Sequence, residues 1–252
     1  MKKGFSIAGV IAGIAAVALL GVLTFLVIDG NNKATKYEEY DFWSVIGPTD
    51  NNGQIADFVK GSPDAKVFLF EFADYQCPLC ATVNPRVNQL IEKYEGKLAV
   101  VLRTYLLPYH QNATAAASAS IAAGLQGYWK AYSDALFANQ AEWEYADTKE
   151  RTELFKKYFE EITEGQGDLA KFEEDLKSPA VSKKVSFDQG IGKRIELPGT
   201  PAFYLDGKLI NFGAKEGDSF TVGDQTFTWG EPQVNDDFSA LMTKIIDAKL
   251  AE

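Results

Sequence analysis

The fold is decided by residues 66–80, which read KVFLFEFADYQCPLC. They begin as an apolar run of strand length and end in the only two cysteines of the 252-residue chain, Cys77 and Cys80. Behind the cysteines, apolar side chains recur at steps of three and four, which is the spacing of one helix face. These positions are Leu79, Val83, Val87, Leu90, Ile91 and Tyr94. The sequence therefore predicts a strand that passes into a helix, with the cysteine pair at the helix N-terminus.

The position of the cysteine pair has a chemical consequence. A helix N-terminus presents free backbone N–H groups and a partial positive charge. A thiolate at Cys77 is therefore favoured over the thiol, and the pKa of Cys77 is expected to fall. Pro78 takes the first helical position, where its missing N–H costs nothing. The spacing therefore predicts a dithiol/disulfide redox centre.

Three other interpretations of the cysteines are open. The pair is also compatible with one half of a metal site or with an inert disulfide. A zinc site requires four ligands, however, and His110 is the only histidine in the chain. A protease pair of His110 and Cys77 is disfavoured, because nothing in the sequence orients His110 and a second thiol stands beside the nucleophile.

Composition and charge limit the class of protein. The chain is 46% hydrophobic and 13% aromatic, which is typical of a globular domain. Its 25 basic and 35 acidic residues give a net charge of −10. A surface of that sign repels phosphate, so nucleic-acid binding is not expected. No cofactor is expected either.

The N-terminus carries a membrane signal. Lys2 and Lys3 precede an apolar run over residues 5–28 without a charged side chain. A helix of that length crosses a hydrocarbon core of about 30 Å, and the lysines predict a cytoplasmic N-terminus with the rest of the chain outside. The alternative is a cleaved signal peptide, whose apolar region is normally about 7–15 residues and ends at an A-x-A-like site. The longer run, with no such site at its end, favours an uncleaved transmembrane anchor over residues 1–30.

The rest of the chain divides into a linker and one domain. Residues 31–60 are expected to form a linker that is partly docked on the domain, which covers residues 61–252. Strands are expected at residues 66–72 and 98–102, on either side of the cysteine helix. A block of helices is expected within residues 111–195, beginning in an alanine-rich stretch that favours helix strongly. Its further segments are expected at residues 128–139, 148–162, 168–176 and 180–195.

The β pattern resumes near the C-terminus. Asp206-Gly207 predicts a tight hairpin between residues 202–205 and 208–212. A second small hairpin is expected from Phe220 to Trp229, and a final helix over residues 234–250.

This order of elements resembles the thioredoxin fold with the helical insertion of the DsbA family, in particular its membrane-anchored bacterial members. The implied fold class is α/β, preceded here by one transmembrane helix. The resemblance spans about residues 61–252 and rests on several motifs in one order. They are Gly61-Ser62-Pro63-Asp64-Ala65, residues 71–80, Pro108 with His110, Gly127-Tyr128-Trp129 near residues 136–140, and residues 198–203.

The resemblance implies a role for each residue of the cysteine motif. Cys77 is the exposed attacking thiolate, and in the oxidised protein it is the sulfur that a substrate thiolate attacks. Cys80 is the resolving thiol, and Pro78 and Leu79 tune Cys77. Strong oxidants of the family have a histidine directly before the second cysteine. This chain has Leu79 there, so the motif alone does not fix the direction of electron flow.

Two further sites follow from the resemblance. Thr200-Pro201 is implied to form a cis peptide bond that faces the disulfide and presents the Thr200 backbone to substrate. Glu71 stands where the family often has a buried acid. As the proton acceptor for Cys80 it needs a raised pKa. The alternative is that Glu71 lies on an edge strand and pairs with a lysine.

The sequence thus predicts a membrane-tethered thiol:disulfide oxidoreductase that introduces disulfides into cysteine-containing exported proteins. Family analogy implies reoxidation by a quinone-linked membrane partner of the DsbB or VKOR type. A reductase or isomerase is the alternative within the enzyme class. A tethered binding module without catalysis is the alternative outside it.

Overall fold

The computed structural model describes residues 37–210, 219–222, 225–228 and 238–252. The chain divides into two compact units, residues 1–41 and 42–252, and the second contains the cysteines. The anchor expected over residues 1–30 lies outside the described residues. Within the described parts, no helix combines the length and the apolar character needed to cross a membrane.

The second unit is built on a five-stranded sheet with the order β1-β3-β2-β4-β5. Central β2 runs parallel to β3 and antiparallel to β4. Both edge strands, β1 and β5, run antiparallel to their neighbours. The strands are β1 (Phe58–Gly61), β2 (Val67–Ala73), β3 (Leu98–Thr104), β4 (Ala202–Leu205) and β5 (Lys208–Ile210).

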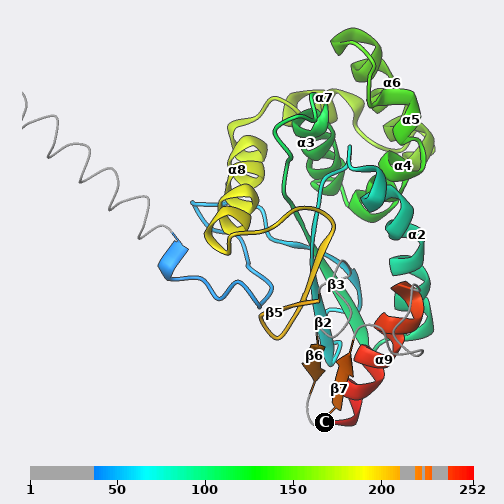
Figure 1. The fold of residues 1–252 in the computed structure, drawn as a ribbon. Coiled ribbons are helices and arrows are strands. Elements are labelled where there is room, and N and C mark those ends of the chain that lie inside the picture. The colour runs from blue at the N-terminus through cyan, green and yellow to red at the C-terminus, as the bar shows by residue number, and fades with distance from the viewer. Residues whose placement is uncertain (1–36, 211–218, 223–224, 229–237) are drawn as a thin grey trace, which may run out of the picture. The chain divides into compact units, whose positions relative to one another are not determined.

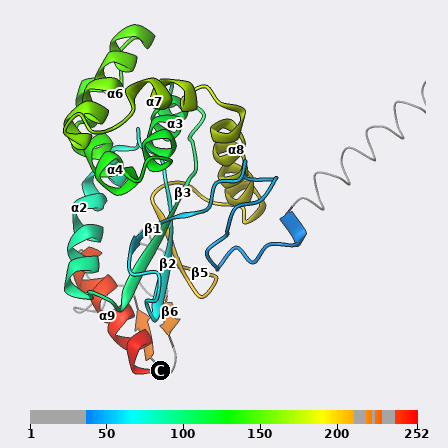
Figure 2. The same ribbon diagram turned by 180° about the vertical axis from the view of Figure 1, so that it is seen from behind.

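One face of the sheet is covered by two helices, α2 (Pro78–Lys93) and α9 (Phe238–Ala251) (Figures 1 and 2). Of the apolar positions predicted for α2, Val83, Val87, Leu90 and Ile91 are buried, because they share one helix face. Leu79, in the first turn, is exposed instead. In α9, Phe238, Leu241 and Ile245 are buried, and Leu250 is partly buried. The shared core includes Val67, Leu69, Val83, Val87, Leu90, Leu98, Val100, Leu241 and Ile245.

The other face is covered by α8 (Pro179–Arg194) and by residues that precede β1. Trp43 stacks on Tyr204 with ring centroids 4.7 Å apart. Arg103 donates to the backbone carbonyls of Phe42 and Ser44. Residues 42–57 therefore belong to the folded unit. The sequence predicted them as part of a linker that is only partly docked on the domain.

The helical insertion lies at the end of the sheet from which α2 starts (Figures 1 and 2). Side chains of Asp147, Asp168 and Ser178 cap three of its helices by accepting backbone N–H groups, as expected for such residues at N-caps. The helices are α3 (Ala113–Gly124), α4 (Trp129–Ala138), α5 (Gln140–Trp143), α6 (Thr148–Thr163), α7 (Leu169–Asp175) and α8.

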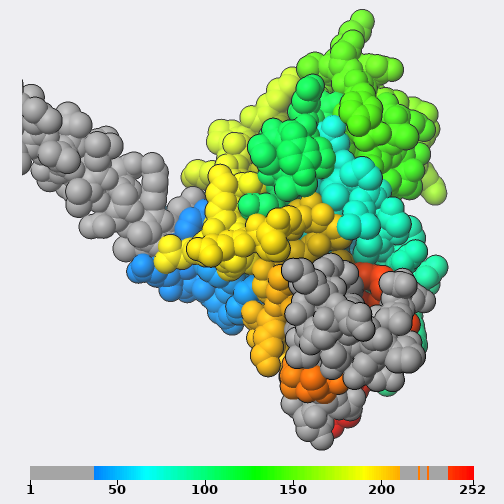
Figure 3. All heavy atoms as spheres, viewed as in Figure 1, coloured from blue at the N-terminus to red at the C-terminus, as the bar shows by residue number. Residues whose placement is uncertain are grey.

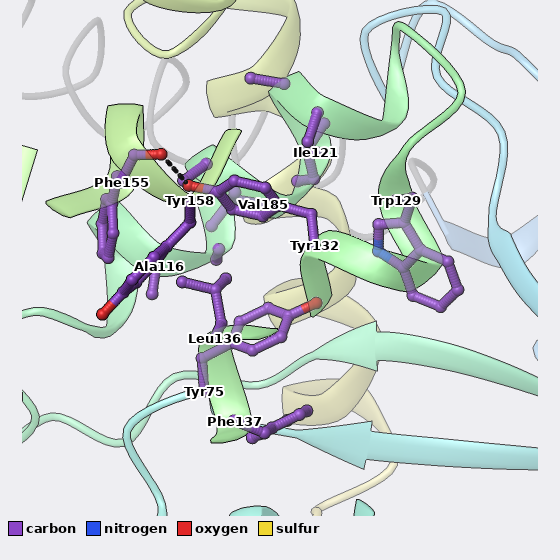
Figure 4. Close-up of a cluster of buried hydrophobic side chains, with 14 of the residues drawn as sticks. Tyr75, Ala116, Ile121, Trp129, Tyr132, Leu136, Phe137, Phe155, Tyr158 and Val185 are labelled. Atoms are coloured by element: carbon purple, nitrogen blue, oxygen red, sulfur yellow. Dashed lines mark hydrogen bonds between the residues drawn. The ribbon is translucent and has the colours of Figure 1, made fainter. Parts of the chain in front are cut away.

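The insertion has its own aromatic core (Figure 4). Phe159 and Phe172 stack with centroids 4.4 Å apart, an arrangement worth about 0.5–1.5 kcal/mol beyond area burial. The Tyr132 hydroxyl donates to the Phe155 carbonyl at 2.8 Å, which satisfies a polar atom deep in this core. Tyr75, from the turn before Cys77, packs against Phe137 of α4 at 4.8 Å. Through this contact, the insertion packs against the turn that precedes Cys77.

The sequence did not predict every element. Strand β1 was not expected, because Phe58–Gly61 is short and begins within the predicted linker. Helix α5 was also not expected, since four residues show no periodicity. The Asp206-Gly207 hairpin is confirmed, and both residues have positive φ, 49° and 77°. The second hairpin is present as β6 (Ser219–Val222) and β7 (Gln225–Thr228).

Candidate active site

The cysteine motif lies at the junction between β2 and α2, as the sequence predicted. Cys77 is the N-cap residue of α2, with extended backbone angles φ −76° and ψ 119°. Its N–H donates to the Asp74 carbonyl at 3.0 Å, and its carbonyl accepts from Ala81 N–H at 3.1 Å. Pro78 is the first residue of the helix. This arrangement places the Cys77 sulfur among the free N–H groups of the first turn.

The Cys77 thiol is acidic. Its pKa is lowered from 9.0 to about 5, mainly by a hydrogen bond from the Cys80 side chain. Burial opposes the shift, and backbone groups of Cys80 and Leu79 contribute to it. A thiol with this pKa is about 99% thiolate at pH 7. The pKa falls although Leu79 carries no charge, because the donors are the neighbouring thiol and the backbone.

Cys80 behaves in the opposite way. Cys80 is 0% exposed and Cys77 is 6% exposed, and both thiols are free. Both residues are therefore buried, whereas the resemblance implied an exposed Cys77. Burial raises the pKa of Cys80, and the hydrogen bond and charge of Cys77 raise it further, with a smaller contribution from Glu71. The pair is therefore asymmetric, with one sulfur held as thiolate and the other held as thiol.

Thr200 and Pro201 complete the site from a distant part of the chain. The Thr200-Pro201 peptide bond is cis, which confirms the prediction. It immediately precedes β4, which pairs with β2 so that Ala202 lies opposite Phe72. The Cys77 Sγ lies 3.4 Å from the Thr200 carbonyl oxygen. Figure 3 shows the segment before β4, in yellow to orange, beside the first part of α2, in cyan.

Glu71 lies in the central strand of the sheet and is 0% exposed. Neither carboxyl oxygen has a hydrogen-bond partner among the described residues. Burial raises its pKa from 4.5 to about 7, against the opposing charge of Lys60. This is the direction of shift that a role as proton acceptor for Cys80 requires. The alternative of an edge-strand acid is wrong, because β3 and β4 flank β2 on both sides.

A polar network that the sequence did not predict holds the cysteine turn. The Asp74 carboxylate accepts the N–H groups of Gln76 and Leu107 at 2.8 Å. Gln140 Nε2 donates to the carbonyls of Tyr75 and Cys77 at 2.7 and 3.1 Å. An aspartate side chain that accepts the backbone N–H two residues further along forms a turn, and aspartate is a recognisable turn residue in a sequence. Gln140, in contrast, reaches the turn from the insertion and leaves no local pattern.

His110 has a structural partner. Its Nδ1 lies 2.8 Å from Asp74 Oδ2, so the structure orients a histidine that the sequence left unoriented. The groups that shift the pKa of Cys77 come from Cys80, Thr200 and Leu79 instead. Over the described ranges, no group of three or more His, Cys, Asp or Glu side chains is arranged to hold a metal ion.

Comparison with known proteins agrees with this geometry. A family model described as Thioredoxin matches residues 54–220, which include both cysteines and the cis peptide bond. Over 155 residues the chain is 31% identical to the Na(+)/H(+) antiporter NhaA 1 of Mycolicibacterium gilvum, covering 60% of this chain and 24% of that protein. The chain thus spans about a quarter of the length of this antiporter.

Two other similarities extend over most of both chains. The probable disulfide bond formation protein D of Bacillus cereus is 26% identical over 210 residues, which is 81% of this chain and 88% of that protein. The crystal structure of oxidised BdbD from Bacillus subtilis aligns with a TM-score of 0.55 and 18% identity, over 84% of this chain and 100% of that one. The chain belongs to the thioredoxin family and has the fold of its DsbA-like thiol-disulfide oxidoreductases.

Proposed function

We propose that the protein is a thiol:disulfide oxidoreductase that introduces disulfides into exported proteins. The observation that carries the proposal is the asymmetry of the cysteine pair. Cys77 has a pKa of about 5 at the N-terminus of α2, whereas Cys80 is fully buried and keeps its proton. In such a pair, Cys77 is the sulfur that forms the mixed disulfide with substrate, and Cys80 is the sulfur that resolves it.

The reaction starts from the disulfide between Cys77 and Cys80. A substrate thiolate attacks Cys77 Sγ, the S–S bond breaks, and Cys80 leaves and takes up a proton. A second substrate thiolate then attacks the substrate sulfur of the mixed disulfide, and Cys77 leaves as thiolate. The substrate loses two electrons and gains a disulfide, while the protein ends as the dithiol.

We assign to Glu71 the exchange of a proton with Cys80. A buried sulfur with a raised pKa is a poor leaving group unless it is protonated as it leaves. At a pKa of about 7, the Glu71 carboxyl is partly protonated at neutral pH. It is therefore suited to give this proton and to take it back during reoxidation.

The low pKa of Cys77 supports the oxidant direction over the reductase. A thiolate that is stabilised in the folded protein favours the dithiol and makes the disulfide a stronger oxidant. Low thiol pKa also speeds departure of Cys77 from the mixed disulfide. The Leu79 side chain, 57% exposed beside Cys77, offers an apolar contact that suits an unfolded protein substrate.

The location and the partner are part of the proposal. The apolar run over residues 5–28 behind Lys2 and Lys3 supports a membrane tether with the cysteines on the extracytoplasmic side. Reoxidation then requires an acceptor of two electrons, for which we propose a quinone-linked membrane protein of the DsbB or VKOR type. N-terminal sequencing of the mature protein tests the tether, since a cleaved chain would lack Met1 and the run.

The activity is tested with the full chain, purified in detergent and oxidised. We expect it to oxidise a reduced, unfolded protein stoichiometrically, and the Cys77→Ser variant to be inactive. Its reduction potential is expected between about −120 and −200 mV. A potential near about −270 mV, that of thioredoxin, would refute the oxidant direction and support the reductase.

A further inference from the structure

Lys60 is a buried cation whose hydrogen-bond donors are all used. It lies in β1, is 0% exposed, and has three ammonium donors. They reach Asn84 Oδ1 at 2.6 Å, Asn88 Oδ1 at 3.3 Å and Asp134 Oδ1 at 2.8 Å. Asn84 and Asn88 belong to α2, whereas Asp134 belongs to α4 of the helical insertion. Among these acceptors, Asp134 alone carries a charge.

Glu71 lies on the same face of the sheet as Lys60. Both Lys60 and Leu69 are in register with Val100, and Glu71 follows Leu69 by two residues, which places it on the same face. The two groups are nevertheless not hydrogen-bonded, because the Glu71 oxygens have no partner among the described residues. Lys60 therefore acts on Glu71 by charge alone, while its donors point to other groups.

We propose that Asp134 is a positioning residue for Glu71, which holds the Lys60 ammonium in place from the insertion and so sets how tightly the Glu71 carboxyl binds its proton. The proposal rests on the proposed function, in which Glu71 exchanges the proton of Cys80. It gives the insertion a part in the chemistry. A residue more than fifty positions after Cys80 would adjust the proton transfer at that sulfur.

The charges around Glu71 fix the direction of the effect. Burial raises the pKa of Glu71 first, Lys60 lowers it and Asp134 raises it. In the part of the chain that the structure describes, Cys80 and Tyr75 also interact with Glu71, and both keep their protons at neutral pH. Strands β3 and β4 place Leu102 and Phe203 beside Glu71, and neither is charged.

Asp134 acts on Glu71 in two ways that add. Its carboxylate repels a charge on Glu71 directly, and its hydrogen bond holds the Lys60 ammonium in place. Replacing Asp134 by Asn keeps the shape and an oxygen that can accept from Lys60, but it removes the negative charge, so the Lys60 charge acts on Glu71 unopposed. The Glu71 carboxyl then ionises at lower pH, and a smaller fraction of it is protonated and able to give a proton to Cys80 at pH 7.

The test is a carbon NMR titration of the Glu71 carboxyl in the full, reduced chain in detergent, labelled with ¹³C-glutamate. The Glu71 signal is identified by its absence in Glu71→Gln. We expect Asp134→Asn to lower the midpoint by about one pH unit, which is a tenfold weaker hold on the proton. Lys60→Met is expected to move the midpoint in the opposite direction, and it serves if the first variant does not fold.

A matched control separates positioning from general disturbance of the insertion. Asp175 of α7 is a buried aspartate paired with Lys171 at 2.5 Å, with no contact to Lys60 or Glu71 among its described interactions. Asp175→Asn is therefore expected to leave the Glu71 midpoint unchanged. A midpoint in Asp134→Asn that equals the wild-type value, or that shifts equally in Asp175→Asn, would overturn the proposal.

The rate at which Cys80 resolves a mixed disulfide of Cys77 with glutathione, measured against pH, separates this proposal from the function. In Asp134→Asn we expect its pH profile to shift with the NMR midpoint. An active protein with an unshifted midpoint overturns the role of Asp134. A shifted midpoint in a protein that does not oxidise thiols overturns the proposed function and leaves the control of Glu71 by Asp134 standing.

Discussion

Two clusters of buried charges lie on opposite faces of the same sheet, and they differ in how completely they are paired. On the α8 face, Asp57 binds Arg103 at 2.6 Å and Lys184 at 2.7 Å, and Lys184 also binds Asp188 at 2.7 Å. On the α2 face, the incomplete cluster consists of Lys60, Asp134 and Glu71. In it, Glu71 has no hydrogen-bond partner among the described residues. Alternation along β3 separates the clusters, because neighbouring side chains of a strand point to opposite faces.

The difference appears in the proton equilibria. Burial alone would raise the pKa of Asp57, but Lys184 and Arg103 lower it to about 2. Burial raises the pKa of Glu71 to about 7, because Lys60 opposes it only by charge. Asp57 therefore keeps its charge at neutral pH, although burial raises the pKa of Asp188 in the same cluster. The incomplete cluster titrates near neutrality, which is what a proton exchanger beside Cys80 requires.

The largest expected effect comes from breaking the paired cluster. Lys184→Met leaves Asp57 and Asp188 buried with one cation fewer, which is expected to cost about 3–5 kcal/mol of unfolding free energy. The measurement is denaturant unfolding at pH 7. Lys171→Met is the matched control, because Lys171 pairs with Asp175 at the same helix spacing but is half exposed. If both variants lose equal stability, the buried pairing is not what stabilises the fold.

The second prediction concerns the incomplete cluster and has the opposite sign. A carboxyl whose pKa is raised by folding stabilises the protein fully below its unfolded pKa, and this stability is lost as pH rises through the folded pKa. For Glu71 the window runs from about 4.5 to about 7. Glu71→Gln should therefore be more stable than wild type by about 3 kcal/mol at pH 8.

The check on Glu71 is the unfolding free energy of both proteins between pH 4 and pH 8, since the gain of the variant should vanish at the acid end. The same variant should resolve mixed disulfides at least about tenfold more slowly at pH 7, because general acid–base catalysis typically contributes more than that. A stability difference that does not vary with pH would mean that Glu71 does not titrate in the folded protein.

The smallest predicted effect concerns the exposed Leu79, beside Cys77. Leu79→His places a titratable cation beside Cys77 and should lower the pKa of the Cys77 thiol further. The dithiol is then favoured, so the reduction potential should become less negative by about 30 mV, which corresponds to about 1.4 kcal/mol. Equilibration with glutathione measures this shift, and Leu79→Ala, which adds no charge, should leave the potential unchanged.

Local patterns predicted most of the fold and the central part of the site. The alternation and helical spacing around Cys77 and Cys80 are local, and so is the Asp206-Gly207 turn. Each of them can be recognised within a few residues. The cis bond at Thr200-Pro201 and the buried Glu71 came from a family resemblance, because neither composition nor spacing reveals them.

The features that the sequence did not predict depend on distant contacts. Strand β1 is recognised only by its pairing with β3, and Gln140 reaches the cysteine turn from the insertion. The pairing of Lys60 with Asp134 joins residues 74 positions apart. Charged residues at such positions look like solvated surface in the sequence, and only the tertiary structure shows that they are buried.

The central claim is that Cys77 is a thiolate at neutral pH, and its most direct test is a titration. The ultraviolet absorbance of the thiolate is followed against pH in the reduced full chain, with Cys77→Ser as the blank. We predict a midpoint at about 5. A midpoint near 9.0, the ordinary value for a cysteine, would contradict the assignment of Cys77 as the reactive sulfur.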